Sequence, residues 1–190
     1  MSAIFSDPLF RRGGTLLGGE KIELDDAGNP IAGKNAVGTV KVFQDVEPTG
    51  EGKRLSEKQV YCIAVRYTGA TVADASTVAG KRYALDGAQE NISAARTKAN
   101  ADAAVPSGIL DEYLLGELRQ NDIVWLVVKG PANVVSTGTI NAGDRVVQAS
   151  TPAGTSVVHG ASGASSTVDG NAIAAAASNK CRVNLTCDFI

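Results

Sequence analysis

The most constraining feature of this sequence is the uninterrupted apolar run from Ile123 to Val128. The run is rich in β-branched residues and has the length of a strand, far too short for a membrane span. A strand that is apolar on both faces must be covered on both sides, so we expect it at the centre of a sheet or at an interface. Trp125 within it is predicted to be a core residue. Lys129-Gly130-Pro131 predicts a turn, and Ala132 to Val135 its hairpin partner.

Further strands are predicted on both sides of this run. The segments 37–43, 60–67 and 145–148 are β-branched or aromatic runs of strand length. Asn141 to Asp144 predicts the turn before the last of them. Residues 149–171 are dominated by Ser, Thr, Ala and Gly, which predicts a long surface excursion with one or two edge strands.

The C-terminal segment has the cleanest alternation in the chain. One face carries an apolar set and the other a polar set: Cys181, Val183, Leu185, Cys187 and Phe189 against Arg182, Asn184, Thr186 and Asp188. A period of two with one apolar face predicts a half-buried strand.

Two helices are predicted in the middle of the chain. Asp86 followed by Gln89 has the spacing of a capping box, and it precedes apolar residues at helical spacing up to Ala103. Ser107 is a suitable N-cap for a second helix over 108–118. The expected fold is therefore mainly β (α+β), with one or two helices. Residues 1–20, punctuated by Gly, are expected to form an extended N-terminal arm, and residues 21–190 one β-rich domain.

Composition limits the classes of partner. The chain has 190 residues, of which 44% are hydrophobic, so wholesale disorder is excluded. Its 18 basic and 20 acidic side chains leave a formal charge of −2, which argues against nucleic acid as the main partner. The first eight residues lack the basic and apolar regions of a signal peptide. We expect neither a nucleic-acid nor a membrane partner.

No catalytic, cofactor-binding or metal site is predicted. Cys181 and Cys187 would lie on one strand face but roughly 20 Å apart, so they can neither bond nor share a metal ion. The cysteines, with Cys62, are interpreted as small buried hydrophobic residues. Residues 28–35 match a phosphate-binding loop except for a final Asn, and a strand follows where a helix is required. The acidic pairs, Asp25-Asp26 and Asp111-Glu112, are explained by a turn and by a helix start.

The order of elements from residue 107 onward carries one resemblance. A predicted short helix leads to Asn121 to Gly130, and a short strand is followed by Thr139 to Val147 with its Ala-Gly-Asp turn. Gly154 in an Ala-Gly-Thr turn, Ala172 to Ala176 and the final strand from Arg182 complete the order. This stretch resembles the C-terminal part of capsid decoration (cement) proteins of tailed bacteriophages.

The resemblance implies a small β-barrel or sandwich-like body, with a barrel-like unit over about 107–190 in which the Gly-Asp turn precedes a barrel strand. It makes Ala174 to Ala177 a strand, although alanine favours helices. It further implies a non-enzymatic virion protein, made in the host cytoplasm, that binds the outside of the capsid and stabilises capsomer junctions. The implied partners are the major capsid protein and further copies of the chain, with a trimer favoured. The expected contact residues lie in the arm: Phe5, Leu9, Phe10, Arg11 and Arg12.

Two alternatives remain open. The first is another virion component, a tail or fibre protein built on the same barrel. The second is a small-molecule-binding or hydrolytic β-barrel with its site near His159, the only histidine. This second alternative requires His159 to meet an acidic residue and a hydroxyl in space.

Overall fold

The computed structural model describes residues 37–46, 54–85, 93–97, 107–149, 152, 155–161 and 164–186. In this part the chain is mainly β, as predicted, and the helical content is one short 3-10 turn, η3 (Ala75–Thr77). The strands, in chain order, are β1 (Val40–Val46), β2 (Arg54–Tyr67), β3 (Arg82–Leu85), β4 (Ser93–Thr97), β5 (Ser107–Leu110), β6 (Ile123–Val135), β7 (Arg145–Ala149), β8 (Ser156–Val158), β9 (Ala164–Ala172) and β10 (Lys180–Thr186).

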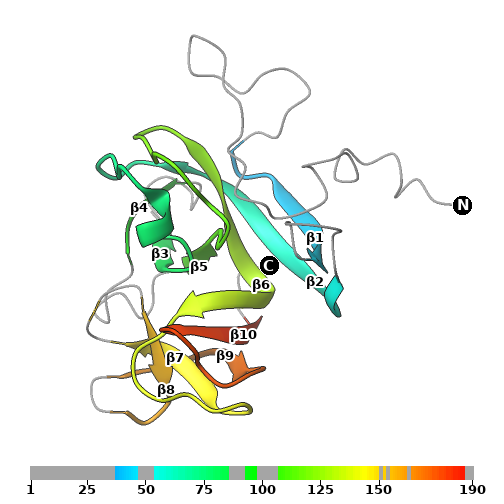
Figure 1. Cartoon of the computed structure of the whole chain (residues 1–190). Helices are drawn as coiled ribbons and strands as arrows, with labels where there is room; N and C mark the ends of the chain where they lie inside the picture. The colour runs from blue at the N-terminus through cyan, green and yellow to red at the C-terminus, as the bar shows by residue number, and fades with distance from the viewer. Residues whose placement is uncertain are drawn as a thin grey trace, which may run out of the picture.

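All ten strands belong to one sheet, in the order β1-β2-β4-β3-β5-β6-β10-β9-β7-β8. The pairings are antiparallel except the parallel contact between β2 and β4. An additional pairing between β2 and β6 turns the first half of the sheet back on itself. The sheet as a whole ends at β1 and β8 and is not a closed barrel. Figure 1 shows β7 to β10 gathered at one end of β6, with β1 to β5 around the rest of it.

The strand β6 is central, as predicted, but the predicted turn at Lys129-Gly130-Pro131 is wrong. The chain continues through Gly130 as one strand, whose first half pairs with β2 and β5 and whose second half pairs with β10. Gly130 has a φ of +95°, and a Cβ atom there would lie 2.2 Å from the carbonyl oxygen of Gln59. The glycine therefore permits a local change of direction and a close approach of β2, rather than a hairpin.

Burial on both faces of β2 and β6 explains their apolar runs. Alternate residues of these two strands enter two separate cores. Trp125 belongs to the first core, as predicted. Its ring and that of Phe43 pack edge to face, with 5.3 Å between the two ring centroids. The first core extends along β10 and includes Phe43, Cys62, Trp125, Val183 and Leu185. The second core lies between β2, β3, β5 and β6 and includes Ile63, Tyr83, Leu110, Val124 and Leu126.

Neither predicted helix is present where the structure describes the chain. Residues 107–110 form β5, in which Ile109 and Leu110 pair with Val127 and Leu126 of β6. Both side chains are about 1% exposed, so burial in the sheet outweighs the local helix signals. Within 86–103, residues 93–97 form strand β4, and the remaining residues of that range lie outside the described part of the chain.

The C-terminal predictions are confirmed in part. The turn at 141–144 precedes β7, and in β10 the residues Cys181, Val183 and Leu185 are buried as the alternation predicted, while 187–189 lie outside the described residues. In the 149–171 excursion β8 is an edge strand, but β9 lies inside the sheet between β7 and β10. The predicted strand at Ala174–Ala177 is wrong. The left-handed backbone of Ser178 and Asn179 follows it, so this segment forms the connection from β9 to β10.

Candidate functional site

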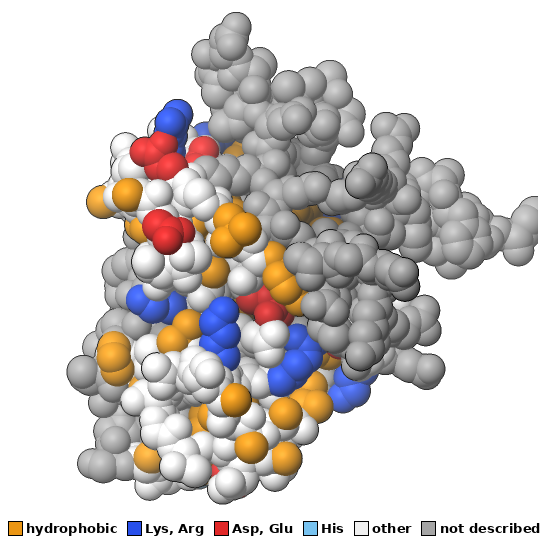
Figure 2. Space-filling view, in the orientation of Figure 1, with side chains coloured by type: hydrophobic (Ala, Val, Ile, Leu, Met, Phe, Trp, Pro, Cys, Tyr) orange, Lys and Arg blue, Asp and Glu red, His pale blue; other side chains and the backbone are white. Residues whose placement is uncertain are grey.

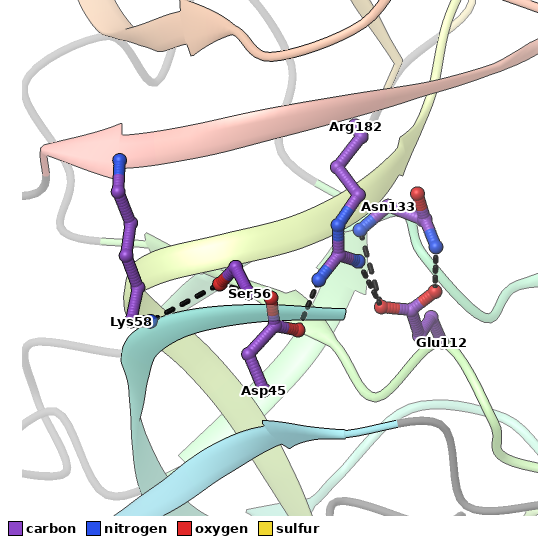
Figure 3. Close-up of polar contacts among 6 residues, drawn as sticks. All are labelled: Asp45, Ser56, Lys58, Glu112, Asn133 and Arg182. Atoms are coloured by element: carbon purple, nitrogen blue, oxygen red, sulfur yellow. Dashed lines mark hydrogen bonds and ion pairs between the residues drawn. The ribbon is translucent and has the colours of Figure 1, made fainter. Parts of the chain in front are cut away.

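The described residues bring one group of charged side chains together in a largely buried position. Arg182 of β10 lies between two carboxylates, Asp45 of β1 and Glu112 of the loop after β5 (Figure 3). The Arg182 side chain is 17% exposed, that of Asp45 5% and that of Glu112 10%. With Ser56 and Asn133 they form what we call the arginine cluster.

Strand geometry places Arg182 in this group. The alternation along β10 directs Arg182 away from the core face that holds Cys181 and Val183. The register of β10 against β6 sets Arg182 opposite Asn133. Glu112 is the central residue of an Asx turn, in which the carboxylate of Asp111 accepts a hydrogen bond from the backbone N–H of Tyr113 at 3.0 Å.

Each carboxylate of the cluster has several donors. Asp45 pairs with one terminal nitrogen of Arg182 and accepts a 2.5 Å hydrogen bond from the Ser56 hydroxyl. Glu112 accepts from the backbone N–H of Asn133 at 3.2 Å and from the side-chain amide of the same residue. The other terminal nitrogen of Arg182 lies 3.5 Å from Glu112 Oε1. These contacts join five parts of the sheet: β1, β2, the loop after β5, β6 and β10.

Electrostatics in the cluster are unbalanced, with two carboxylates against one guanidinium. Burial raises the pKa of Glu112, and the hydrogen bonds from Asn133 and the charges of Arg182 and Lys180 only partly offset it. Burial, with the nearby charge of Glu112, also raises the pKa of the Tyr113 phenol. Figure 2 shows basic side chains beside an acidic one in the middle of this face. Because both carboxylates are engaged by donors, the arrangement is suited to holding strands together rather than to proton transfer.

His159 lies in the turn after β8 and is exposed. Its backbone N–H donates to the carbonyl of Arg145 at 2.8 Å. In the described residues no ion pair or hydrogen bond joins its imidazole to an acidic side chain or a hydroxyl, which is the contact that the second alternative requires. That alternative receives no support from this part of the chain.

The five arm residues expected to contact a capsid lie outside the described part of the chain: Phe5, Leu9, Phe10, Arg11 and Arg12. Cys62 and Cys181 are buried free thiols, as interpreted from the sequence, and burial raises the pKa of both. Cys187 is outside the described residues. No group of three or more His, Cys, Asp or Glu side chains in the described ranges is placed to hold a metal ion.

The sequence does not predict the arginine cluster. It predicts a helix start at Asp111-Glu112 and places Arg182 on the polar face of a strand. The signal that the sequence offers is Arg182 itself, a long cationic side chain in a strand whose alternate residues are apolar. Its partners Asp45 and Glu112 are 137 and 70 residues away in the chain, so no local pattern connects them.

Comparison with known proteins does not identify a relative. No protein-family model, curated protein or solved structure matches the chain. Among the residues that the structure describes, no helix is long and apolar enough to cross a membrane.

Proposed function

We propose that this chain is a capsid decoration protein of a tailed bacteriophage, a non-enzymatic virion component that binds the outer capsid surface and stabilises capsomer junctions. The supporting observation is the arrangement of residues 123–186. A long strand, β6, is followed by the Gly-Asp turn, then β7, and β10 returns between β6 and β9. Of the order that the resemblance implies, the structure has the apolar strand from Ile123, the Gly-Asp turn directly before a strand, and the final strand.

The turn itself is well formed. The carboxylate of Asp144 accepts a 2.7 Å hydrogen bond from the backbone N–H of Asn141, and Gly143 has a φ of +89°. The N–H of Gly143 donates to the carbonyl of Ala172, at the end of β9. These contacts tie the turn to the strand beside β10, and they support a compact β body for this half of the chain.

The continuity of the sheet also supports the proposal. The sheet runs from β1 to β8, and the arginine cluster links strands from both halves of the chain. We propose that this body holds its contact surfaces in fixed positions, and that many copies on one shell add their binding energies. The arm residues Phe5, Phe10, Arg11 and Arg12 are proposed to contact the major capsid protein.

The test uses expanded shells of the phage that encodes the chain, assembled without it. Purified protein is sized by light scattering and mixed with the shells, and the mixture is imaged by electron cryomicroscopy. We expect a trimer and regular added density at capsomer junctions, and loss of that density when residues 1–20 are deleted. Arg119→Glu, an exposed charge change in the loop before β6, is the matched control and should leave binding unchanged.

Two results would count against the proposal. A protein that never associates with shells, while its tryptophan fluorescence reports a folded core, excludes the decoration function. Added density on the tail or fibres instead of the shell supports the alternative virion component.

A further inference from the structure

Two serine residues are neighbours where the edge strand β8 reaches the end of β6. Ser136 directly follows β6, and Ser156 is the first residue of β8. They form a parallel bridge, in which the N–H of Thr137 donates to the carbonyl of Ser156 at 2.9 Å. Residues bridged in this way are neighbours on the same side of the backbone, about 5 Å apart.

Both side chains point into the interior. Ser136 comes two residues after Val134, a member of the first core, so it lies on the same face of the strand. Ser156 pairs with Gln148 of β7. Gln148 comes two residues after Val146, a member of the first core, so this pair lies on the core face of β7. Ser136 is 5% exposed and Ser156 1%.

Neither serine hydroxyl oxygen has a hydrogen-bond partner among the described residues. The neighbouring Thr155 shows the usual solution, because its hydroxyl donates to the carbonyl of Pro152 at 2.7 Å. A buried hydroxyl without a partner is unfavourable, and two adjacent ones in the same core are rare in stable folds.

The chemistry of the two side chains favours a small shared ligand. Two hydroxyls, each able to donate and accept, match a molecule with two donors and two acceptors. Gln148, which is 1% exposed, lies opposite Ser156 and is a further buried polar residue at this place.

We propose that Ser136 and Ser156 bind one internal water molecule, which bridges their hydroxyls and joins β8 to the end of β6. A buried water makes about two to four hydrogen bonds, and the two serine hydroxyls supply two of them. The site is independent of the proposed function. The water lies where β8, the edge strand of the sheet, contacts the residue after β6 through the bridge between Ser136 and Ser156.

The first test is a high-resolution crystal structure of the whole chain. We expect a density peak within hydrogen-bond distance of both serine Oγ atoms. A direct hydrogen bond between the two hydroxyls, or no density between them, would overturn the proposal.

The second test detects the water in solution by magnetisation transfer from water to the backbone amides of Thr137 and Ser156. We expect long-lived cross-peaks in the natural protein and their loss in the Ser136→Ala/Ser156→Ala variant. Ser136→Ala alone serves if the double variant does not fold. Ser76→Ala, at an exposed position in η3, is the matched control and should retain the cross-peaks. Unchanged cross-peaks in the double variant would show that this site does not hold the water.

Discussion

Replacing Arg182 with methionine tests the arginine cluster directly. Methionine keeps most of the aliphatic stem but removes the guanidinium, so Asp45 and Glu112 lose their shared cation. Both carboxylates are at least 90% buried, and removing one partner from a buried charged group costs about 3–5 kcal/mol. Because Arg182 itself is 17% exposed, and water can reach part of its site, we expect a value near 3 kcal/mol.

The assay is urea unfolding followed by the fluorescence of Trp125, the only tryptophan. Trp125 is 7% exposed and contacts Phe43 of β1, so its emission reports whether β1 remains packed on the core. With a urea dependence of about 2–3 kcal/mol per molar, a loss near 3 kcal/mol lowers the midpoint by about 1–1.5 M. Adding Asp45→Asn to Arg182→Met should recover part of this loss, since it removes one unpaired charge.

Arg119→Met is the matched control. Arg119 pairs with Glu117 at 2.6 Å, but their side chains are 71% and 42% exposed, so solvent screens the pair. We expect little change in the midpoint of this variant. If Arg182→Met lowers the midpoint no more than Arg119→Met does, the cluster does not stabilise the fold and the reasoning is refuted.

The remaining predictions concern pH, a glycine and the thiols. The raised pKa of Glu112 means that the folded state binds more protons than the unfolded chain between the ordinary and the raised value, so the free energy of unfolding should fall as pH rises through that interval. Glu112→Gln should flatten this dependence, and an unchanged slope in urea titrations would contradict it. Gly130→Ala should lower the free energy of unfolding by about 4 kcal/mol. About 1–2 kcal/mol of this loss comes from the left-handed backbone, and the rest comes from the clash of the new Cβ atom with β2. Gly138→Ala, with a φ of +73° and open space around its Cβ position, should lose only the backbone part, and equal losses in thermal unfolding would refute the clash. Cys62 and Cys181 should react with a thiol reagent only after unfolding, because burial raises the pKa of both thiols and blocks access to them. Peptide mapping of the labelled protein checks this, and labelling of the native protein at the rate of the unfolded chain would contradict it.

The predictions that held rest on local periodicity. The apolar run at 123–128 became the central strand, and the alternation from Cys181 to Leu185 correctly assigned the buried face of β10. Trp125 entered the core because a strand covered on both faces has no exposed side. Each of these features depends on residues that are neighbours in the chain.

The predictions that failed did so where distant residues competed with local signals. Ser107 and the acidic residues after it have the composition of a helix start, but pairing with β6 and β3 buries Ile109 and Leu110 completely. Gly130-Pro131 has the composition of a turn, yet the chain continues because β10 pairs with the residues beyond it.

The sequence by itself determined that this chain is mainly β, that the strand beginning at Ile123 is covered on both faces, and which side of the last strand is buried, because side-chain periodicity of two is set by the backbone alone. Only the tertiary structure decided how the strands are ordered, that the sheet stays open from β1 to β8, and that Arg182 meets Asp45 and Glu112. Strand pairing uses the same backbone hydrogen bonds whatever the sequence, so the choice of partner depends on how all the faces pack together, and that information is not local.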